Sequence, residues 1–505
     1  MGICYLAIDC GTSGVKCLLL DDEGGIIGFA RNEWSYVTPP EIPFAVEFDP
    51  KLFWEKTCKT VKEALRNGKV SKNDVAAIST TSQRYGVVFL DAKGDEVYGG
   101  PNIDARGFLA QDQIIDKFGT DIYRITGKWP PLLFAAARLL WFRENQPNVY
   151  RKINQILPFN NWIVFKLSGI YASTPSSAAE TSLFDLKRME WAWNIIEELE
   201  FPKDIFPTVH EAGEAIGEID REAATICELK AGTPVVLASG DTQCGLLGMQ
   251  AIKPGQVGIV SGMTTPLQLV TSEPLIDSEM RTWTGCHVVP KMWVAESNAG
   301  MTGEVITWFI DKILSIPRDA DESYKELDRL ASRTPPCSEE TLTFAGPEIM
   351  DVKNITQLKP NIILFPRPVG PATKPIGVGE LARSNLENIA FAIKGNYIQL
   401  EDIYGEKIRD VRITGGMCRL KTFLQIVADV LGLPIKTTRI RNGSALGCAI
   451  CAAVGSRKYA TFEKAAKSLI RWKTSINPDE KRAKIYRTCF ERWISVYNRL
   501  NELEE

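Results

Sequence analysis

The pattern of apolar and polar residues at the start of the chain predicts a hairpin of two buried strands. Apolar residues run from Tyr5 up to Asp9, a turn of small residues follows, and a second apolar run extends from Val15 to Leu20. This second run ends in the polar, glycine-containing stretch 21–25. Strand, glycine turn, strand and turn is the order typical of a β-hairpin.

The turn of this hairpin has the composition of a phosphate-binding nest. Its glycines let backbone N–H groups approach an anion closely, Thr12 and Ser13 add hydroxyl donors, and Lys16 adds positive charge. Asp9 lies beside the turn, where a carboxylate suits the waters of a Mg²⁺ ion that bridges phosphate oxygens. An ordinary hairpin is the alternative. Neither a GxxxxGK[ST] motif nor the helix of a Rossmann fingerprint follows.

Strand and helix patterns alternate beyond the hairpin, as expected for an α/β fold. The short apolar run 75–79 predicts a buried strand, and the polar residues Gln83, Arg84 and Tyr85 follow it. Open α/β sheets bind ligands at the carboxyl ends of their strands, so these three residues are substrate-binding candidates. Asn102, Asp104 and Arg106 are further candidates, although a structural pair of Asp104 with Arg106 is an equal alternative.

A second candidate region is the segment 233–248. An apolar strand pattern ends in Ser239-Gly240-Asp241, and a small-residue helix pattern follows. Asp241 is thus a lone carboxylate at a strand end and a helix start, with Thr242 and Gln243 beside it as substrate-binding candidates. The alternative is that Asp241 only caps the helix, which is a common role of aspartate.

The segment 255–270 repeats the design of the amino terminus: a strand pattern, a small polar turn with Gly262 and Thr264, and a second strand pattern. One motif used twice predicts two duplicated domains that hold a polyphosphate, with a boundary near residue 250. Gly303 and the pair Gly415-Gly416 lie at further strand-to-helix junctions, where glycine lets a phosphate or a flat ring approach the backbone. A helix-packing glycine is the alternative at each.

Composition narrows the class of protein. At 505 residues and 45% hydrophobic content the chain is expected to form two or more globular domains. The net charge of −3 comes from 59 basic and 62 acidic residues without a block of one sign, so we expect no nucleic-acid or membrane partner. No leader and no apolar run of ~20 residues is present, which predicts a cytoplasmic protein.

The cysteine and histidine content argues against a disulfide framework, a CxxC metal or redox site and histidine-based catalysis. The 12 cysteines are scattered through apolar segments, which indicates free thiols rather than a disulfide framework. Cys448 and Cys451 have CxxC spacing but lie in a small-residue helix pattern, so we expect core packing. His210 and His287 are the only histidines, and we expect both to be structural.

Taken together, these segments resemble the FGGY carbohydrate kinases from Tyr5 to about Gly455. The matching residues, in the order of the family's motifs, are the phosphate turn 9–14, Gly240-Asp241, the second phosphate turn 261–264, Gly303, Gly415-Gly416 and a signature helix around 380–391. Further segments, such as 102–106 and 229–236, are similar to the autoinducer-2 kinase group. The resemblance implies an α/β fold of two actin-like, ribonuclease-H-like domains with a cleft between them, expected at 1–248 and 249–505.

The resemblance also implies transfer of the ATP γ-phosphoryl group to a hydroxyl of a small sugar or polyol: a ketopentose such as xylulose or ribulose, or the autoinducer-2 precursor. Asp241 would be the general base, Asp9 would hold Mg²⁺ through water, and the two turns would hold phosphates. The family often forms dimers. A non-catalytic, actin-like ATP-binding scaffold is the alternative, but such a scaffold has no need of Asp241.

Three residues depart from the family's pattern. Met263 replaces a threonine of the second phosphate turn, so the hydroxyl contact must come from Thr264 or be lost. Tyr85 replaces the acidic residue that follows the arginine in glycerol and autoinducer-2 kinases. Asn102 replaces a tryptophan that packs on substrate in glycerol kinase and xylulokinase. Because polar contacts decide which hydroxylated substrate is accepted, these changes predict an altered specificity.

Overall fold

The computed structural model describes residues 2–316, 320–357, 360–367 and 375–502. The chain forms two units. The first comprises Met1–Pro254, Val270–Val294 and Asn442–Arg471, and the second comprises Gly255–Leu269, Ala295–Arg441 and Trp472–Glu505. The first unit therefore takes in two segments from beyond the predicted boundary at residue 248.

A six-stranded sheet forms the centre of the first unit, in the order β12-β13-β4-β1-β2-β3. β1 and β2 pair antiparallel, with Tyr5 opposite Leu20 and Gly11 opposite Gly14, which confirms the predicted hairpin. β1 and β13 both pair parallel to β4, so the carboxyl ends of three neighbouring strands lie at one edge. The strands are β1 (Cys4–Gly11), β2 (Gly14–Asp21), β3 (Ile26–Glu33), β4 (Val75–Ser82), β12 (Ala215–Glu218) and β13 (Pro234–Val236).

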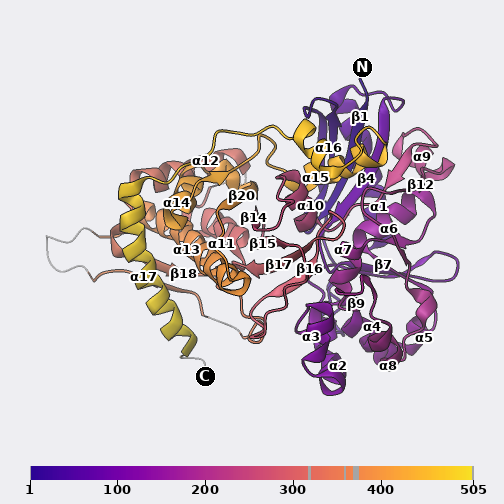
Figure 1. Cartoon of the computed structure of the whole chain (residues 1–505), viewed down its shortest axis with the longest axis horizontal. Coiled ribbons are helices and arrows are strands. Elements are labelled where there is room, and N and C mark those ends of the chain that lie inside the picture. The colour runs from indigo at the N-terminus through magenta and orange to yellow at the C-terminus, as the bar shows by residue number, and fades with distance from the viewer. Residues whose placement is uncertain (1, 317–319, 358–359, 368–374, 503–505) are drawn as a thin grey trace. The chain divides into compact units, whose positions relative to one another are not determined.

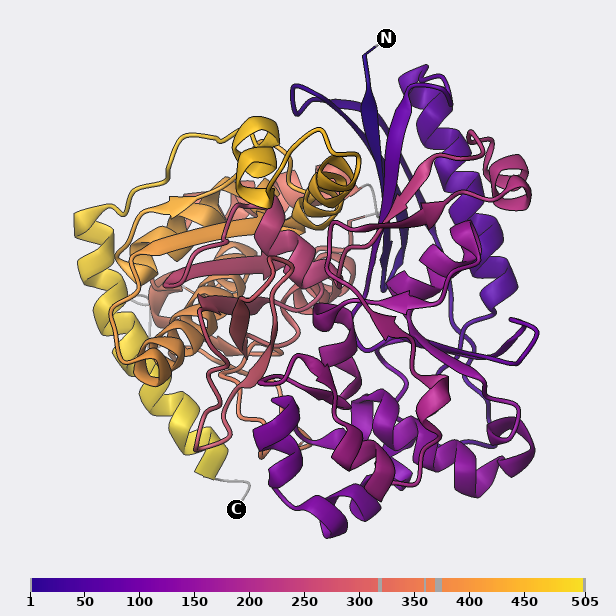
Figure 2. The same cartoon turned by 45° about the vertical axis from the view of Figure 1, so that its right-hand side comes forward.

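Helices cover this sheet. α1 begins at Pro50 because Asp49 caps it, accepting hydrogen bonds from the backbone N–H groups of Lys51 and Leu52. α15 and α16 come from near the end of the chain, yet α15 packs against β1 and β4 (Figures 1 and 2). The helices concerned are α1 (Pro50–Gly68), α6 (Phe159–Ser168), α9 (Arg221–Cys227), α10 (Asp241–Gly248), α15 (Gly443–Gly455) and α16 (Phe462–Leu469).

Close packing of α10 and α15 explains the small residues of both helices. A Cβ atom on Gly447 would collide with the carbonyl oxygen of Cys244, so only glycine lets the two backbones approach this closely. Cys448 and Cys451 are free and buried in α15, which confirms the prediction that the CxxC spacing serves core packing.

The first unit also contains a smaller region that is built on a second sheet. Its three-stranded sheet has the order β6-β5-β7. Its elements are β5 (Val87–Leu90), β6 (Glu96–Gly100), β7 (Gln155–Pro158), α2 (Gln111–Phe118), α3 (Asp121–Thr126), α4 (Ala135–Asn145), α5 (Pro147–Tyr150), α7 (Pro175–Ala178), η3 (Ala179–Thr181) and α8 (Trp193–Glu198).

The second unit repeats the design of the first. β14 and β15 form an antiparallel hairpin, and β14 pairs parallel to β20, with Ser261 opposite Gly415. The same pairing relates β1, β2 and β4, which supports the predicted duplication of one motif. The strands are β14 (Gln256–Ser261), β15 (Pro266–Thr271), β17 (Trp293–Asn298), β20 (Asp410–Gly415) and β21 (Ile435–Lys436), and the helices include α11 (Thr302–Trp308), α12 (Ala320–Arg333), α13 (Val378–Tyr404), α14 (Lys421–Leu431) and α17 (Glu480–Glu502).

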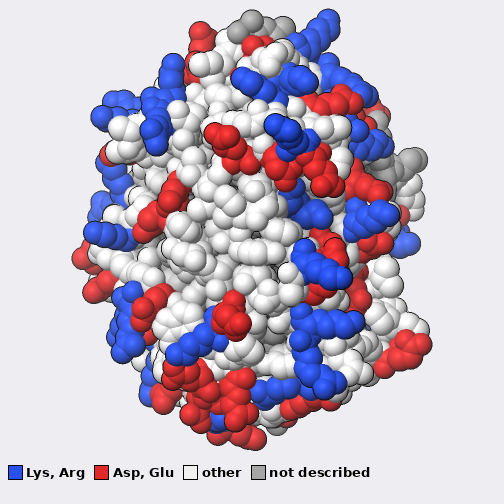
Figure 3. Space-filling view, turned by 90° about the vertical axis from the view of Figure 1, so that its right-hand side faces the viewer, with Lys and Arg blue, Asp and Glu red and all other residues white. Residues whose placement is uncertain are grey.

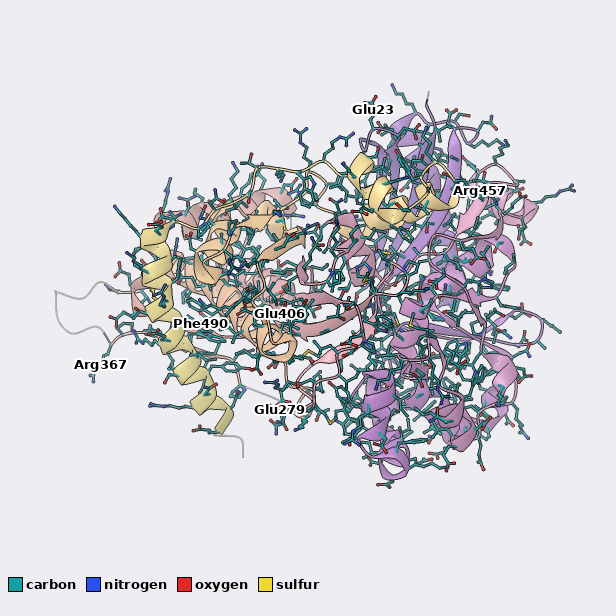
Figure 4. All side chains as sticks on the ribbon, in the orientation of Figure 1. Glu23, Glu279, Arg367, Glu406, Arg457 and Phe490 are labelled. Carbon is teal, nitrogen blue, oxygen red and sulfur yellow. A yellow bond between two sulfur atoms is a disulfide. The ribbon has the colours of Figure 1, made fainter. Side chains whose placement is uncertain are left out.

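α17 packs on the second unit through aromatic side chains. Phe490 points from α17 toward α13, where Lys394 Nζ lies 5.2 Å from its ring centroid (Figure 4). A disulfide between Cys337 and Cys489 also ties α17 to the segment before β18 (Leu342–Phe344). The prediction of free thiols is therefore wrong for these two cysteines, because residues 152 positions apart fold to a Cα–Cα distance of 6.1 Å, while ten others are free and buried.

The surface carries charges of both signs. On the face shown in Figure 3, lysine and arginine side chains alternate with aspartate and glutamate side chains around an uncharged area. Among the described residues, none of the helices is long and apolar enough to cross a membrane.

Candidate active site

Three neighbouring parallel strands of the first unit end in polar candidates. In register, Asp9 of β1 lies opposite Thr81 of β4, and Ser82 at the end of β4 forms a bridge with Gly240 beyond β13. The backbone N–H of Gln83 donates to the carbonyl of Cys10 at 2.8 Å. The sheet thus brings Asp9, Gln83 and the residue after Gly240 to one edge, where ligands bind in open α/β sheets.

Asp241 is the first residue of α10, and Gly240 is its N-cap residue, without a side-chain capping bond. The Oδ1 atom of Asp241 accepts a hydrogen bond from Thr242 Oγ1 at 3.2 Å. Burial raises the pKa of the Asp241 carboxyl to about 6. The positive charge of Arg84 lowers this pKa, and the negative charge of Asp9 raises it. Asp241 is therefore not the capping residue of α10, and the pKa of its carboxyl lies above the usual range of aspartate.

The predicted acceptor residues are linked to the predicted phosphate turn. Gln83 Oε1 accepts a hydrogen bond from the backbone N–H of Asn102 at 3.1 Å, and Asn102 Nδ2 donates to Thr12 Oγ1 at 3.1 Å. Gln83 Nε2 donates to the hydroxyl of Tyr36 at 3.1 Å, and Tyr36 in turn donates to the carbonyl of Thr12. The residues predicted to bind the acceptor and those predicted to bind phosphate thus form one hydrogen-bond network in the first unit.

The turn residues themselves leave their donors accessible. Ser13 is exposed, and Thr12 and Lys16 are half-buried. Lys16 Nζ lies 3.6 Å from Asp9 Oδ2, and 31% of the Lys16 side chain is exposed. A cation that is paired yet still reachable suits a phosphate group.

Arg84 and Tyr85 are held in place by aromatic and charged neighbours. Tyr85 has a left-handed backbone with φ of 63°, and Arg84 Cζ lies 5.1 Å from the Tyr85 ring centroid. The Tyr85 ring also contacts Phe134 and Trp283 edge-on, with centroids 5.2 and 5.6 Å apart. A strained backbone fixed by this packing is typical of functional positions.

Asp104 is fully buried and occupied by structural contacts. It accepts hydrogen bonds from Arg106 Nε at 2.9 Å, from the backbone N–H of Val46 at 3.0 Å and from the Tyr98 hydroxyl. Arg106 is also fully buried and pairs with Glu47. For Asp104 and Arg106 the structure therefore favours the structural pair over the predicted substrate contact, because no side-chain surface is left for a ligand.

The candidates of the second unit also gather at strand ends. Gly303 N–H donates to the carbonyl of Met263 at 2.9 Å, and a Cβ atom on Gly303 would collide with the carbonyl oxygen of Gly262. A Cβ atom on Gly415, whose φ is 110°, would likewise collide with the carbonyl oxygen of Ser261. The second phosphate turn, Gly303 and the 415–416 pair therefore form one glycine-lined group.

The hydroxyl groups around the second turn are divided between structure and surface. Thr265 Oγ1 lies 3.1 Å from Ser261 Oγ and 2.6 Å from Thr302 Oγ1, all buried. Met263 is 46% exposed, and Thr264 is half-buried. Within the 261–264 turn, the hydroxyl of Thr264 is therefore the more accessible one, and its contact with a ligand stays a prediction.

The carboxylate oxygens of Asp9 and Asp241 suit a Mg²⁺ ion that is bound by few protein ligands. Among the residues that the structure describes, no group of three or more His, Cys, Asp or Glu side chains could hold a metal ion. Asp9 and Asp241 nevertheless lie close enough for the charge of Asp9 to raise the pKa of Asp241. Carboxylate oxygen is a ligand that Mg²⁺ prefers, and water with substrate phosphate commonly completes its shell.

Sequence reasoning missed several residues of the site. Trp34 Nε1 and Tyr36 both bond the carbonyl of Thr12, and Glu180 lies 3.9 Å from Arg84 Nη1. Lys128 pairs with Glu180. No local pattern marks these residues. Only a charged residue inside an otherwise apolar or small-residue stretch, as at Lys128 and Glu180, could have drawn attention to them.

His287 is structural, as predicted, because backbone groups occupy both of its ring nitrogens. His287 Nε2 lies 3.0 Å from the carbonyl of Ala251, and Nδ1 accepts from the backbone N–H of Val289 at 2.8 Å. Burial lowers the His287 pKa to about 4. The side chain is therefore neutral and fully bonded at neutral pH.

The duplicated hairpin-and-parallel-strand design and the two glycine-rich turns are typical of the two-domain, actin-like class of fold. The model of the N-terminal domain of the FGGY family of carbohydrate kinases matches residues 4–248, and the model of its C-terminal domain matches residues 258–456. The chain belongs to the FGGY family of carbohydrate kinases, as the sequence motifs predicted.

Relatives and solved structures agree with this assignment. Autoinducer-2 kinase of Escherichia coli K12 is 31% identical, covering 97% of this chain and 93% of the relative, and that of Yersinia enterocolitica is 30% identical over 97% and 94%. Xylulose kinase from Rhodospirillum rubrum has a TM-score of 0.83 at 21% identity, covering 99% of both chains. Plasmodium falciparum glycerol kinase with ADP has a TM-score of 0.82 at 18% identity, covering 98% of this chain and 99% of that one.

Proposed function

We propose that this kinase transfers the γ-phosphoryl group of ATP to a hydroxyl of a small sugar, with Asp241 as the general base. The observation that carries the proposal is the position of Asp241 at the shared strand edge, with a pKa raised to about 6 by burial. A carboxylate with this pKa is ionised at neutral pH and still basic enough to accept a hydroxyl proton.

The residues present account for the proton that moves, the bond that forms and the bond that breaks. The acceptor hydroxyl gives its proton to the Asp241 carboxylate, its oxygen forms a bond to the γ-phosphorus, and the bond between that phosphorus and the bridging oxygen breaks to release ADP. Gln83, Arg84, Tyr85, Asn102, Thr242 and Gln243 would orient the acceptor. Thr12, Ser13, Lys16, Gly262, Thr264, Gly303, Gly415 and Gly416 would bind ATP.

Asp9 would hold Mg²⁺ through water. When bound, Mg²⁺ neutralises charge on the phosphate oxygens. Lys16 contributes to the same end, because its ammonium group lies next to Asp9 and is accessible from solvent. The autoinducer-2 kinases and the xylulose kinase among the similar proteins support two acceptor classes: ketopentoses such as xylulose or ribulose, and the autoinducer-2 precursor.

ADP release from the purified protein tests the proposal. ATP and Mg²⁺ would be supplied with ketopentoses, pentitols, glycerol, gluconate, deoxy-ketoses and the autoinducer-2 precursor in turn. We expect one acceptor to raise ADP release far above the rate with ATP alone. ATP binding without acceptor-dependent ADP release across the whole panel would instead favour the non-catalytic scaffold.

A further inference from the structure

A buried ion pair lies beneath the predicted acceptor residues of the first unit. Lys128 Nζ is 3.0 Å from Glu180 Oε2, and the two side chains are only 2% and 5% exposed. Removing two charges from water is costly, so the pair itself adds little stability, but loss of one partner would leave the other charge buried without its counter-charge. The contacts of Glu180 indicate what this pair supports.

The backbone holds Lys128 in a fixed position. α3 ends at Thr126, and Gly127 caps it with a φ of 68° and a close approach to the carbonyl of Thr284 that leaves no space for a side chain. The N–H of Thr284 donates to the Gly127 carbonyl at 3.0 Å. The ammonium group then lies 5.9 Å from the ring centroid of Tyr85 and 5.7 Å from that of Trp283, within reach of cation–π attraction.

Glu180 connects this lysine to two acceptor candidates. Its Oε1 accepts a hydrogen bond from Gln243 Nε2 at 2.7 Å and lies 3.9 Å from Arg84 Nη1. An ionised carboxylate only accepts hydrogen bonds, so Gln243 must turn its NH₂ group toward Glu180 and its oxygen away. Gln243 is fully buried, and its Oε1 has no hydrogen-bond partner among the described residues.

Lys128 is what keeps Glu180 in this role. A carboxyl group buried without a cation tends to take up a proton, and a protonated carboxyl can donate as well as accept. The amide of Gln243 would then be free to bond in either orientation. Without Lys128, Arg84 would also become the main counter-charge of Glu180 and would be drawn away from Asp241.

We propose that Lys128 and Glu180 are positioning residues for the sugar acceptor, Lys128 by fixing the Glu180 carboxylate and Glu180 by orienting Gln243 and Arg84. This inference rests on the proposed sugar kinase function. It assigns the pair no contact with ATP, so the effect of breaking it is confined to acceptor kinetics.

Steady-state kinetics of Lys128→Met test the inference, with the acceptor varied at saturating ATP and ATP varied at saturating acceptor. We expect the acceptor KM to rise at least tenfold and the ATP KM to change less than twofold. Lys166→Met is the matched control, because Lys166 also pairs with a glutamate at 3.0 Å, Glu96, but away from the acceptor candidates. It should leave both constants unchanged.

The double variant Lys128→Met with Glu180→Gln separates positioning from stability. It removes both charges of the Lys128–Glu180 pair, so it should melt at a higher temperature than Lys128→Met, which leaves the Glu180 carboxylate buried without its lysine. A glutamine at 180 can donate or accept, so it does not fix the amide of Gln243, and the acceptor KM should stay raised. If kinetics recover together with stability, or if Lys128→Met lowers stability alone, the pair is merely structural and the inference is wrong.

The outcome also separates this inference from the function on which it rests. A wild-type protein without acceptor-dependent turnover contradicts the proposed function, and the inference falls with it. A wild-type protein that turns over an acceptor while Lys128→Met keeps the wild-type acceptor KM contradicts the inference alone.

Discussion

Aspartates with different surroundings have different chemistry in the first unit. Asp104 is fully buried and accepts from Arg106, Val46 and Tyr98, so its oxygens are used by the protein. Asp241 is partly exposed and accepts from Thr242. A carboxylate with oxygens still available can accept a proton from a ligand, which is why the proposed base is Asp241.

Asp241→Asn should fold and bind ATP but lose phosphoryl transfer. Asparagine keeps the size of the side chain but cannot take up the hydroxyl proton, and general base catalysis contributes about 10²–10⁴-fold to rate. Acceptor-dependent ADP release measures the loss, and ATP binding with circular dichroism serves as the control for folding. Near-normal turnover in this variant would remove Asp241 from the role of base.

The rate should depend on pH through the same carboxyl. Because burial raises the Asp241 pKa to about 6, the group is protonated and inactive below that pH and ionised above it. We expect acceptor kcat/KM to fall about tenfold per pH unit below pH 6 and to be level above pH 7. Melting temperature over the same range controls for acid unfolding. A rate limb centred near pH 4 would mean that the base is solvated.

Arg84→Ala should raise the acceptor KM far more than the ATP KM. Arg84 lies 3.9 Å from Glu180 and is close enough to Asp241 to lower the pKa of that carboxyl, so we expect its loss to remove donors to the sugar hydroxyls. Arg66→Ala is the control, since Arg66 pairs with Glu228 on the exposed surface. Equal changes in both KM values would place Arg84 outside the acceptor site.

Strands of the second unit pack closely at glycines. The adjacent glycines Gly415 and Gly416 differ, because only Gly415 packs against another strand. A Cβ atom on Gly415 collides with Ser261 and requires a left-handed backbone, whereas a Cβ atom on Gly416 meets no protein atom within 4 Å. β20 and β14 are therefore joined by Gly415, and Gly416 lies at an open surface.

Gly415→Ala should lower the melting temperature, because the collision and the positive φ cost about 1–3 kcal/mol. Gly416→Ala should melt as the wild type does but raise the ATP KM, since the added methyl group occupies space predicted for adenosine. Differential scanning calorimetry and ATP-varied kinetics compare the two variants. A normal ATP KM in Gly416→Ala would contradict the predicted adenosine contact.

At the scale of the whole molecule, cross-links between distant segments stabilise the second unit. The Cys337–Cys489 disulfide closes a loop of 152 residues, and Arg383, Glu387 and Tyr486 form a buried hydrogen-bonded cluster between α13 and α17. Closing a long loop removes entropy from the unfolded chain, so the disulfide stabilises the folded state.

Reduction should therefore destabilise the oxidised protein by about 2–4 kcal/mol, seen as a lower melting temperature in dithiothreitol. Cys489→Ser should melt at the lower temperature with or without the reductant. A wild-type melting temperature that is insensitive to reductant, together with two titratable thiols at these positions, would contradict the cross-link.

Most of the fold and of the proposed site followed from local sequence patterns. Both hairpins, the strand at 75–79, which the structure extends to Ser82, and the helix with Asp241 at its start were predicted from apolar runs and glycines. These features depend on neighbours in the chain. The patterns could not decide whether Asp104 binds substrate. That question depends on Tyr98 and Arg138, which occupy its surroundings from other elements.

The sequence by itself determined the two phosphate-type turns, the strand-end carboxylates and the carbohydrate kinase family, because each is a continuous segment whose residue types carry the chemistry. Only the tertiary structure decided which charged groups share a buried site. Lys128, Glu180 and Gln243 come from separate segments, and the Cys337–Cys489 pair is likewise far apart along the chain. Burial and ion pairing act through space, so no pattern within one segment records them.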